Sequence, residues 1–152
     1  MPSRYISGEN EKQEKVKMTV PVRTEITLQD GWGDGNFPKR RMHKKMCFYL
    51  GRKHQANPPT PFDPDVKIHK PDKELTMYVH TFGGYATQDT NLKHAKKFAK
   101  RLNGVGMWMD RDHFYTASYD DPMKSTNRRN EVMFPVLINK PRWMGKPTKA
   151  HN

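Results

Sequence analysis

Residues able to carry catalysis are scattered along the sequence without a familiar spacing. There is no His-Glu-x-x-His pattern, no Cys/His pair spaced like a nucleophile and its base, no Gly-x-Ser-x-Gly elbow and no P-loop. Residues 31–35, Gly-Trp-Gly-Asp-Gly, superficially resemble a phosphate cradle but lack the Lys-Ser/Thr that follows one. We therefore expect a non-enzymatic protein without a metal site. Its seven histidines, each expected to be a surface or structural residue, are His43, His54, His69, His80, His94, His113 and His151.

One charged run lies near the C-terminal end of the sequence, where residues 127–131 read Asn-Arg-Arg-Asn-Glu. If these side chains pack against a strand, they could form a buried charge network. If the two arginines are exposed instead, they could bind an anion. We favour the network, because the run leads into the last predicted strand.

The chain is strongly basic, with 28 Lys and Arg against 16 Asp and Glu and a formal charge of +12. This balance favours an anionic partner, such as nucleic acid, a lipid headgroup, or a phosphate or carboxylate ligand. Trp32, Phe37 and Trp143 lie among basic residues, a mixture suited to backbone contact and base stacking. Nucleic-acid binding is therefore an alternative function, although no known DNA- or RNA-binding motif accompanies it.

The cysteine content and the length of the apolar runs indicate in which cellular compartment the protein is expected. The single cysteine, Cys47, excludes an intrachain disulfide and is expected to be an inert core residue. The longest apolar runs, such as residues 136–138, are far too short to span a bilayer, and the N-terminus opens on polar residues rather than on an apolar signal. We expect a cytoplasmic protein with no membrane span.

The length of 152 residues fits one domain. An aromatic share of 11% argues against an intrinsically disordered chain, which would be poor in aromatic residues. We place the domain at residues 1–140 and interpret residues 141–152 as a polar C-terminal tail.

Apolar/polar alternation predicts six strands in one mainly antiparallel sheet or open barrel. They are Val16–Ile26, Met46–Leu50, Val66–His69, Leu75–Phe82, His113–Tyr119 and Glu131–Ile138. Pro21 should place the first strand at an edge or in a bulge, since proline donates no ladder hydrogen bond. The strands at 66–69 and 75–82 are predicted to form a hairpin, and 75–82 should be central because both its faces carry bulky residues. The Gly-rich, basic stretch 29–45 is predicted to be a long loop.

A helix is predicted over Thr90–Asn103, with Thr87 or Asp89 as its cap and Gly104 as its stop. Its apolar positions follow a period near 3.6 and are Leu92, Ala95, Phe98, Ala99 and Leu102. The opposite side carries Lys93, Lys96, Lys97, Lys100 and Arg101. That side could be a nucleic-acid or membrane face, but a solvated amphipathic face is the favoured interpretation.

Several ordered blocks of the sequence resemble the SOUL haem-binding family. Residues 10–12, Asn-Glu-Lys, followed by residues 17–22, Lys-Met-Thr-Val-Pro-Val, resemble its lysine-methionine-threonine-x-proline-valine block and the approach to it. Residues 57–61 leading into 66–68, and residues 76–79 leading into 81–86, resemble its central hairpin and phenylalanine-glycine-glycine turn. The strongest match is residues 115–124 followed by residues 127–132.

The resemblance implies an α+β fold: a distorted, mainly antiparallel β-barrel or open sheet with flanking helices, built from two related halves. Family members carry an extra first strand and most of a first helix before the position of Arg4, so we expect a member that lacks both. A missing strand would leave unpaired backbone groups on its neighbour. Self-association, or a partner chain at the open sheet edge, is therefore expected.

The resemblance also implies a ligand, haem or another tetrapyrrole or amphipathic anion, bound by an apolar surface rimmed with basic residues. Haem is an apolar disc with two carboxylates, so its site needs apolar walls and a cationic rim. The resemblance implies that basic residues at the end of the first helix and in the Pro-Met-Lys loop grip the propionates, and the nearest positions are Arg4 and Lys124. Residues that could supply walls, although ordinary core packing is the favoured interpretation of each, are Tyr5, Met18, Val20, Met77 and Met123.

Two further implications of the resemblance find no counterpart in this sequence. Some family members have an assigned axial histidine in the N-terminal half, and no equivalent is evident here, so we expect haem binding without an axial protein ligand. Some are proposed to carry a helical ligand motif of the Bcl family near the second helix. The corresponding stretch, residues 98–106, has no acidic residue after either glycine, which weakens a protein-interaction role.

Overall fold

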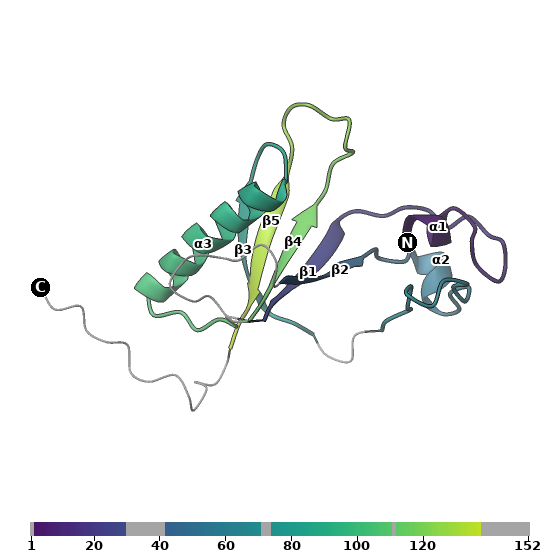
Figure 1. Ribbon diagram of the computed structural model, residues 1–152, viewed down its shortest axis with the longest axis horizontal. Helices are drawn as coiled ribbons and strands as arrows, with labels where there is room; N and C mark the ends of the chain where they lie inside the picture. Colours follow the sequence, from purple (N-terminus) through teal and green to yellow (C-terminus); the bar gives the residue numbers. More distant parts are fainter. Residues whose placement is uncertain (1, 30–41, 71–73, 111, 138–152) are drawn as a thin grey trace, which may run out of the picture.

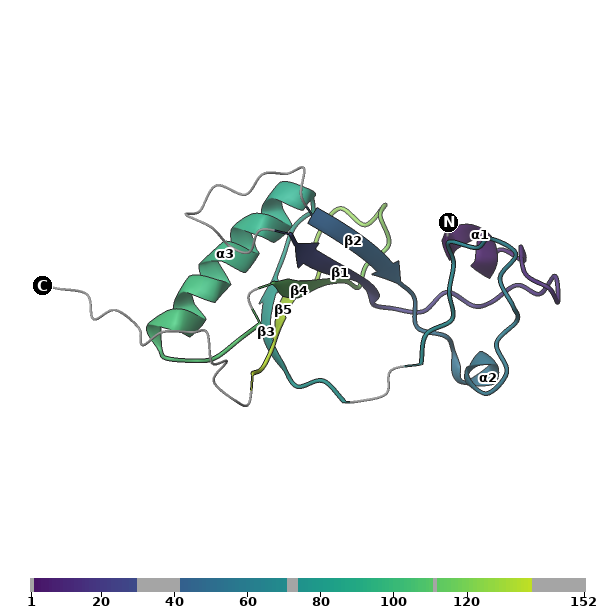
Figure 2. The same ribbon diagram turned by 60° about the horizontal axis from the view of Figure 1, so that its bottom comes forward.

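The computed structural model describes residues 2–29, 42–70, 74–110 and 112–137. A small N-terminal lobe stands beside a sheet that carries one long helix (Figure 1). The elements follow the order α1 (Pro2–Ile6), β1 (Val22–Leu28), β2 (Met42–Cys47), α2 (Arg52–Gln55), β3 (Met77–Phe82), α3 (Gln88–Gly104), β4 (His113–Ser118) and β5 (Asn130–Pro135). Helices α1 and α2 both belong to the lobe (Figures 1 and 2).

The five strands form one antiparallel sheet in the order β2-β1-β4-β5-β3. Within the described residues the sheet is open rather than closed, with β2 and β3 as its edges. The α+β prediction, with a mainly antiparallel open sheet, is confirmed. The expectation of self-association at an open edge stays a prediction.

The core lies between α3 and one face of the sheet, because alternate strand residues meet the apolar stripe of the helix. The helix buries Leu92, Ala95, Ala99 and Leu102, as its period predicted. The facing strand residues include Ile26, Leu28, Phe114, Val132 and Phe134. The Thr87 hydroxyl accepts a hydrogen bond from the backbone N–H of Thr90 at 3.2 Å, which confirms Thr87 as the cap.

The first strand begins six residues later than predicted, at Val22 instead of Val16. Residues 16–21 form no strand, because the backbone N–H of Val16 donates to Ile6 within the lobe, at 2.9 Å, and Pro21 has no N–H to give to a ladder. Strand β1 begins at Val22, immediately after the proline, and it is an inner strand rather than an edge.

Strand β2 begins at Met42, inside the stretch predicted to be a loop. Its polar composition hid it, since His43, Lys44 and Lys45 break the apolar/polar alternation. Four of its six residues are exposed, because among the described residues β2 pairs with β1 alone. Lysines are common on such edges because they discourage pairing with another chain.

The predicted hairpin of residues 66–69 and 75–82 is wrong. Residues 66–69 form no strand, and β3 pairs with β5 instead, with Met77 opposite Pro135 and Phe82 opposite Asn130. The prediction of a central strand also fails, since β3 is an edge. The bulky side chains on its two faces have different surroundings. Phe82 and Tyr78 pack toward α3, whereas Val79 on the opposite face is exposed.

Strands β4 and β5 agree with prediction to within one residue at each start. The loop at residues 31–35, the aromatic residues Trp32, Phe37 and Trp143, and the polar tail at 141–152 lie outside the described residues, as does the predicted end of the last strand at Ile138.

Candidate functional site

Asn10 organises the lobe that carries α1. Its side chain is fully buried, and its Nδ2 donates to the backbone carbonyls of Tyr5 at 3.0 Å and Glu14 at 2.8 Å. Its Oδ1 accepts from the backbone N–H groups of Lys12 and Glu14, both at 3.2 Å. One amide side chain thus uses both donors and its acceptor to close the turn that follows α1.

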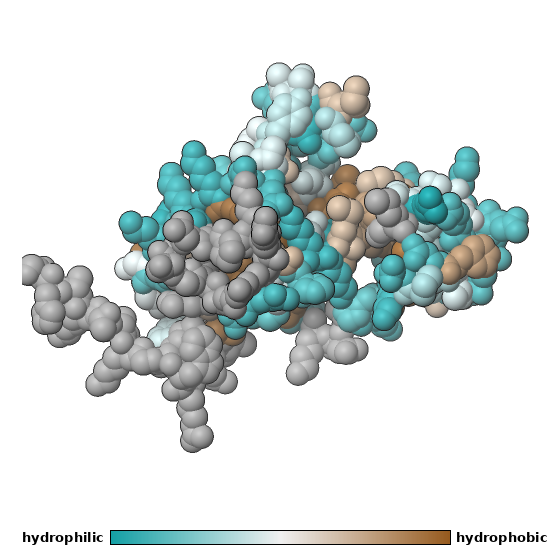
Figure 3. Space-filling view, in the orientation of Figure 1, coloured by the Kyte–Doolittle hydropathy of each residue, from teal (hydrophilic) through white to brown (hydrophobic). Residues whose placement is uncertain are grey.

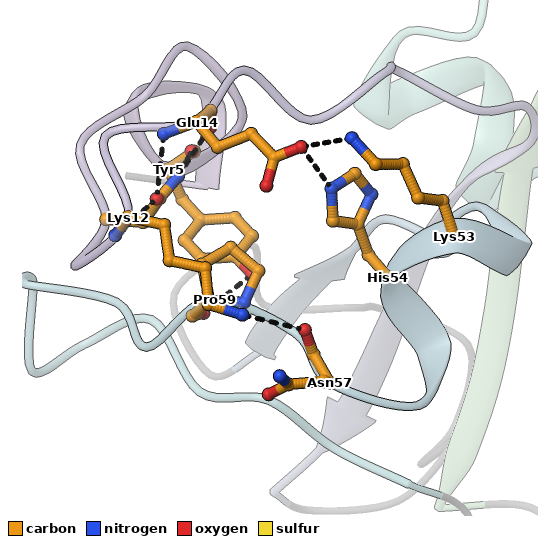
Figure 4. Close-up of polar contacts among 8 residues, drawn as sticks. Tyr5, Lys12, Glu14, Lys53, His54, Asn57 and Pro59 are labelled. Carbon is orange, nitrogen blue, oxygen red and sulfur yellow. Dashed lines mark hydrogen bonds and ion pairs between the residues drawn. The ribbon is translucent and has the colours of Figure 1, made fainter.

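The turn and α1 are fastened to residues 57–61, nearly fifty positions later in the sequence (Figure 4). The Tyr5 hydroxyl donates to the carbonyl of Pro59 at 2.9 Å, and the Glu11 N–H donates to the carbonyl of Thr60 at 2.9 Å. In return the Thr60 N–H donates to the Glu11 carboxylate at 3.1 Å, and this hydrogen bond is the main reason that the pKa of Glu11 lies below its usual value. Two of the sequence blocks that carry the family resemblance therefore pack against each other.

Helix α2 is tied to the same turn through Glu14. The Glu14 carboxylate forms an ion pair with Lys53 and lies 3.2 Å from Nε2 of His54, a buried histidine (Figure 4). The hydrogen bond from Lys53, followed by that from His54, lowers the pKa of Glu14. His54 is a structural residue of the lobe.

Tyr5 and Arg4 have different surroundings although they are adjacent on α1. The Tyr5 ring is buried under the lobe, so its contribution is structural in this arrangement. The Arg4 side chain is largely exposed, and its Nε lies 3.9 Å from the Glu9 carboxylate. Arg4 is thus the residue of this pair that a ligand can reach.

The loop between β4 and β5 is held by an arginine at its centre. Nη1 of Arg128 donates to the carbonyls of Asp121 at 2.9 Å and Lys124 at 2.6 Å, while its guanidinium lies 4.7 Å from the ring centroid of Tyr85. Asp120 forms an ion pair with Lys124 and accepts from the Arg129 N–H. The hydrogen bond from Lys124 is the main cause of the lowered pKa of Asp120. The loop therefore presents the Lys124 ammonium in a defined place.

Apolar side chains lie uncovered between this loop and the lobe. Met18 is 52% exposed and Val20 is 62% exposed, on the segment that runs from the lobe to β1, and Met123 on the loop is 89% exposed. The Thr19 hydroxyl between them donates to the carbonyl of Tyr49. Hydrophobic colour appears in this region, between the protruding loop and the lobe (Figure 3). We call Met18, Val20, Tyr49 and Met123 the apolar saddle.

Met77 lies elsewhere. The register places Phe82 at the end of β3 beside Asn130, where the β4–β5 loop ends, and Met77 opposite Pro135 at the other end. Met18 and Val20 are exposed on the segment that joins the lobe to β1. Helix α1, which carries Arg4, and the β4–β5 loop, which carries Lys124, are on separate parts of the molecule (Figures 1 and 2).

Sequence reasoning missed a stack of Arg23 with two tyrosine rings at the end of the sheet where the β4–β5 loop lies. The Arg23 guanidinium lies 5.6 Å from the ring centroid of Tyr49 and 5.1 Å from that of Tyr115. Burial, and then the Glu25 carboxylate, raises the pKa of Tyr115. The Tyr49 ring is about half exposed, so the stack offers a flat surface beside Val20 and Met18.

The charged run at residues 127–131 forms the predicted network. Glu131 is buried and receives hydrogen bonds from Nη2 of Arg129 at 2.6 Å and from the Tyr119 hydroxyl at 2.8 Å. The Arg129 guanidinium also covers the Tyr119 ring, 4.4 Å from its centroid. These contacts fix the base of the loop that carries Met123 and Lys124.

Two histidines pair on the face of the sheet that α3 covers, His80 from β3 and His94 from α3 itself. Nε2 of His80 on β3 faces Nδ1 of His94 on α3 at 3.1 Å, and the His94 ring stacks on Phe82 with centroids 4.0 Å apart. At 3.1 Å only one proton fits between the two nitrogens. Within the described residues no group of three or more potential metal ligands exists, and no described helix is long and apolar enough to cross a membrane.

The histidine pair predicts acid sensitivity. Burial, then Arg101 and Lys97, lowers the pKa of His80, and burial, then His80 and Lys93, lowers that of His94. An unfolded histidine titrates near pH 6.5. Below about that pH the unfolded state binds more protons than the folded state, so the free energy of unfolding should fall as the pH drops, and should not depend on these groups above it.

Urea unfolding measured between pH 7.5 and 5 would check this. In the variant His94→Phe the loss of stability on acidification should be smaller, whereas in the control His69→Gln, at an exposed histidine, it should be unchanged. An equal acid loss in His94→Phe and the unmodified protein would exclude the pair as the cause.

The chain is similar in sequence to one family of known proteins. The family model described as SOUL heme-binding protein matches residues 3–135. The chain is 34% identical to human Heme-binding protein 2 over 97% of this chain and 65% of that protein. It is 36% identical to mouse Heme-binding protein 1 over 85% of this chain and 64% of that protein. The chain thus spans slightly less than two thirds of these relatives.

Proposed function

The chain belongs to the SOUL heme-binding protein family, and from this membership we propose that it binds haem or another flat tetrapyrrole without catalysing a reaction. The observation that carries the proposal is the family match over residues 3–135, together with relatives whose names state haem binding. The formal charge of +12 supports an anionic ligand.

The apolar saddle is the proposed wall of the site. Flexible, polarizable methionines adapt to a flat ligand, and Met18 and Met123 are both exposed. The half-exposed Tyr49 ring, backed by the Arg23 guanidinium, offers a face on which a macrocycle can stack. Tyr5 supports the wall indirectly by fixing α1, and Met77 has no part in it.

Arg4 and Lys124 are the proposed cationic rim. Arg4 lies against Glu9 in a pair whose two side chains are both largely exposed, whereas Lys124 is partly exposed and pairs with the mostly buried Asp120. An exposed ion pair contributes little free energy, so a ligand carboxylate can replace Glu9 at small cost, and at Lys124 it binds beside the existing pair. The rim thereby selects ligands with anionic substituents.

The iron has no protein axial ligand in this proposal. His54 is committed to Glu14, and His80 and His94 to each other, away from the saddle. Binding without an axial ligand depends on stacking and rim contacts, so it should be weak and reversible.

Haemin titration of the double variant Arg4→Ala, Lys124→Ala tests the proposal. Each charge-assisted hydrogen bond contributes about 1.5 to 3 kcal/mol, and at exposed sites the lower end applies, so each lost cation should weaken binding about tenfold and the double variant about a hundredfold. Both side chains are exposed at the surface, so the fold should be retained. Haemin with esterified propionates should lose comparable affinity for the unmodified protein.

The matched control removes two exposed cations from α3, Lys93→Ala and Lys97→Ala, and should leave the haemin affinity within about twofold. Single histidine substitutions should leave the Soret band nearly unchanged. If one of them abolishes the band while the Arg4/Lys124 pair has no effect, an axial-ligand site replaces the proposed rim.

A further inference from the structure

The solvent side of α3 is a continuous basic face. Lys93, Lys97, Lys100 and Arg101 are all exposed and recur at spacings of three and four, which places them on one side of a helix. The buried residues Leu92, Ala95, Ala99 and Leu102 occupy the other side. The cations therefore point away from the sheet over more than two turns.

The charges of this face also reach the histidine pair. Burial is the main cause of the lowered pKa of His80 and of His94, and cations of the face contribute to it: Arg101 and Lys97 at His80, and Lys93 and Lys97 at His94. The first turn of the helix holds one acidic residue, Asp89, and none follows it on α3. The face is thus complementary to an extended anionic surface.

Two exposed aliphatic side chains adjoin the end of this face. Val105, directly after α3, is 72% exposed, and Met107 is 46% exposed. The turn that carries them is well defined: the Met107 N–H donates to Leu102 at 2.9 Å, and Gly106 between them has a φ of +73°, which favours glycine. A fixed turn presents two apolar side chains to solvent beside Lys100 and Arg101.

We propose that this surface, the basic face of α3 with Val105 and Met107 at its end, docks on an anionic lipid bilayer. Cations along a helix bind the anionic headgroups, and the neighbouring aliphatic side chains enter the boundary between headgroups and acyl chains. A nucleic-acid surface needs cations for the phosphates and aromatic rings for base stacking. Val105 and Met107 provide neither, so their exposure favours lipid over nucleic acid.

The surface is separate from the apolar saddle. Met109, two residues after Met107, bridges to Val136 beyond the end of β5, whereas the β4–β5 loop with Lys124 precedes the start of β5. The apolar turn and the loop therefore lie toward opposite ends of the sheet. Lipid docking does not depend on the proposed tetrapyrrole site.

Vesicle co-sedimentation of the whole chain tests the inference. Vesicles of phosphatidylcholine with about a third phosphatidylserine should bind the protein, and pure phosphatidylcholine vesicles should not. Each basic residue near an anionic surface contributes about a fivefold change in affinity, so Lys93→Gln, Lys97→Gln, Lys100→Gln should weaken binding roughly a hundredfold. The charge-matched control Lys15→Gln, Lys67→Gln, Lys70→Gln, at exposed positions off the helix, should weaken it far less.

The variant Val105→Ser, Met107→Ser separates lipid from nucleic acid. Removing the two apolar groups should weaken vesicle binding about tenfold while leaving the binding of a single-stranded oligonucleotide unchanged. Vesicle binding that is unaffected by this variant, or equal on neutral and anionic vesicles, would overturn the inference. If the α3 lysines matter only for the oligonucleotide, the face is a nucleic-acid surface instead.

Discussion

Replacing Asn10 with leucine, a residue of similar size, should lower the free energy of unfolding by on the order of 3 kcal/mol or unfold the N-terminal lobe outright. Four hydrogen bonds converge on this buried side chain. Each contributes about 1 kcal/mol, and the backbone groups left behind, including the carbonyl of Tyr5, lose their partner away from water. Asn10→Asp should cost at least as much, because it keeps the two acceptor contacts but sets a buried carboxylate oxygen against the carbonyls of Tyr5 and Glu14.

Urea unfolding, with hydrogen exchange of the Glu11 and Glu14 amides, measures this effect. The control Asn57→Leu makes the same change at an exposed position of the same lobe and should stay within about 0.5 kcal/mol of the unmodified protein. A loss below 1 kcal/mol for Asn10→Leu would mean that the lobe does not depend on this residue.

The second large effect is expected in the sheet. Phe134 is fully buried, with the rings of Phe98 and Phe114 at centroid distances of 5.9 and 5.8 Å. Phe134→Ala should lower the free energy of unfolding by about 3 to 5 kcal/mol, because it removes buried apolar surface and leaves a cavity that α3 and β4 can only partly fill.

Phe62 supplies the matched control for that change. Its side chain is largely exposed, so Phe62→Ala should cost less than about 1 kcal/mol. Similar losses for the two substitutions, measured by urea unfolding at one pH, would show that the core is not where α3 meets β4 and β5.

The parts of the fold that were predictable are those that local pattern determines. Helix α3 follows from its period and its Thr87 cap, and β4 and β5 follow from their apolar/polar alternation, although consecutive residues of both strands are buried. Strand β2 escaped prediction because an edge strand is free to be polar. The pairing of β3 with β5 escaped because it joins segments some fifty residues apart, while local spacing favoured a hairpin.

The site residues taken from family resemblance stay predictions. Arg4 and Lys124 are exposed, as a cationic rim requires, and Met18 and Val20 are exposed on the segment between the lobe and β1. Tyr5 was misjudged as simply apolar, since no local signal shows that its hydroxyl meets the Pro59 carbonyl. The Tyr49 stack depends on the register that sets Arg23 opposite both Cys47 and Ala117, which no single segment encodes.

The two proposed surfaces respond to different substitutions. Changes at Arg4 and Lys124 should affect haemin and not vesicles, and changes at Lys93 and Lys97 should do the reverse. This reciprocity makes each set of variants the control for the other, with net charge altered equally in both double variants.

Nuclear magnetic resonance of the isotope-labelled chain with haemin tests the central claim most directly, because ferric haem broadens amide signals near its binding place. Stoichiometric haemin should broaden the amides of residues 17–20 and of Asp121, Met123 and Lys124, with a diamagnetic zinc porphyrin shifting the same signals without broadening them. The amides of α3 around Lys97 should keep their line widths. No selective broadening at stoichiometric haemin, or broadening centred on His80 and His94, would contradict a tetrapyrrole site at the apolar saddle.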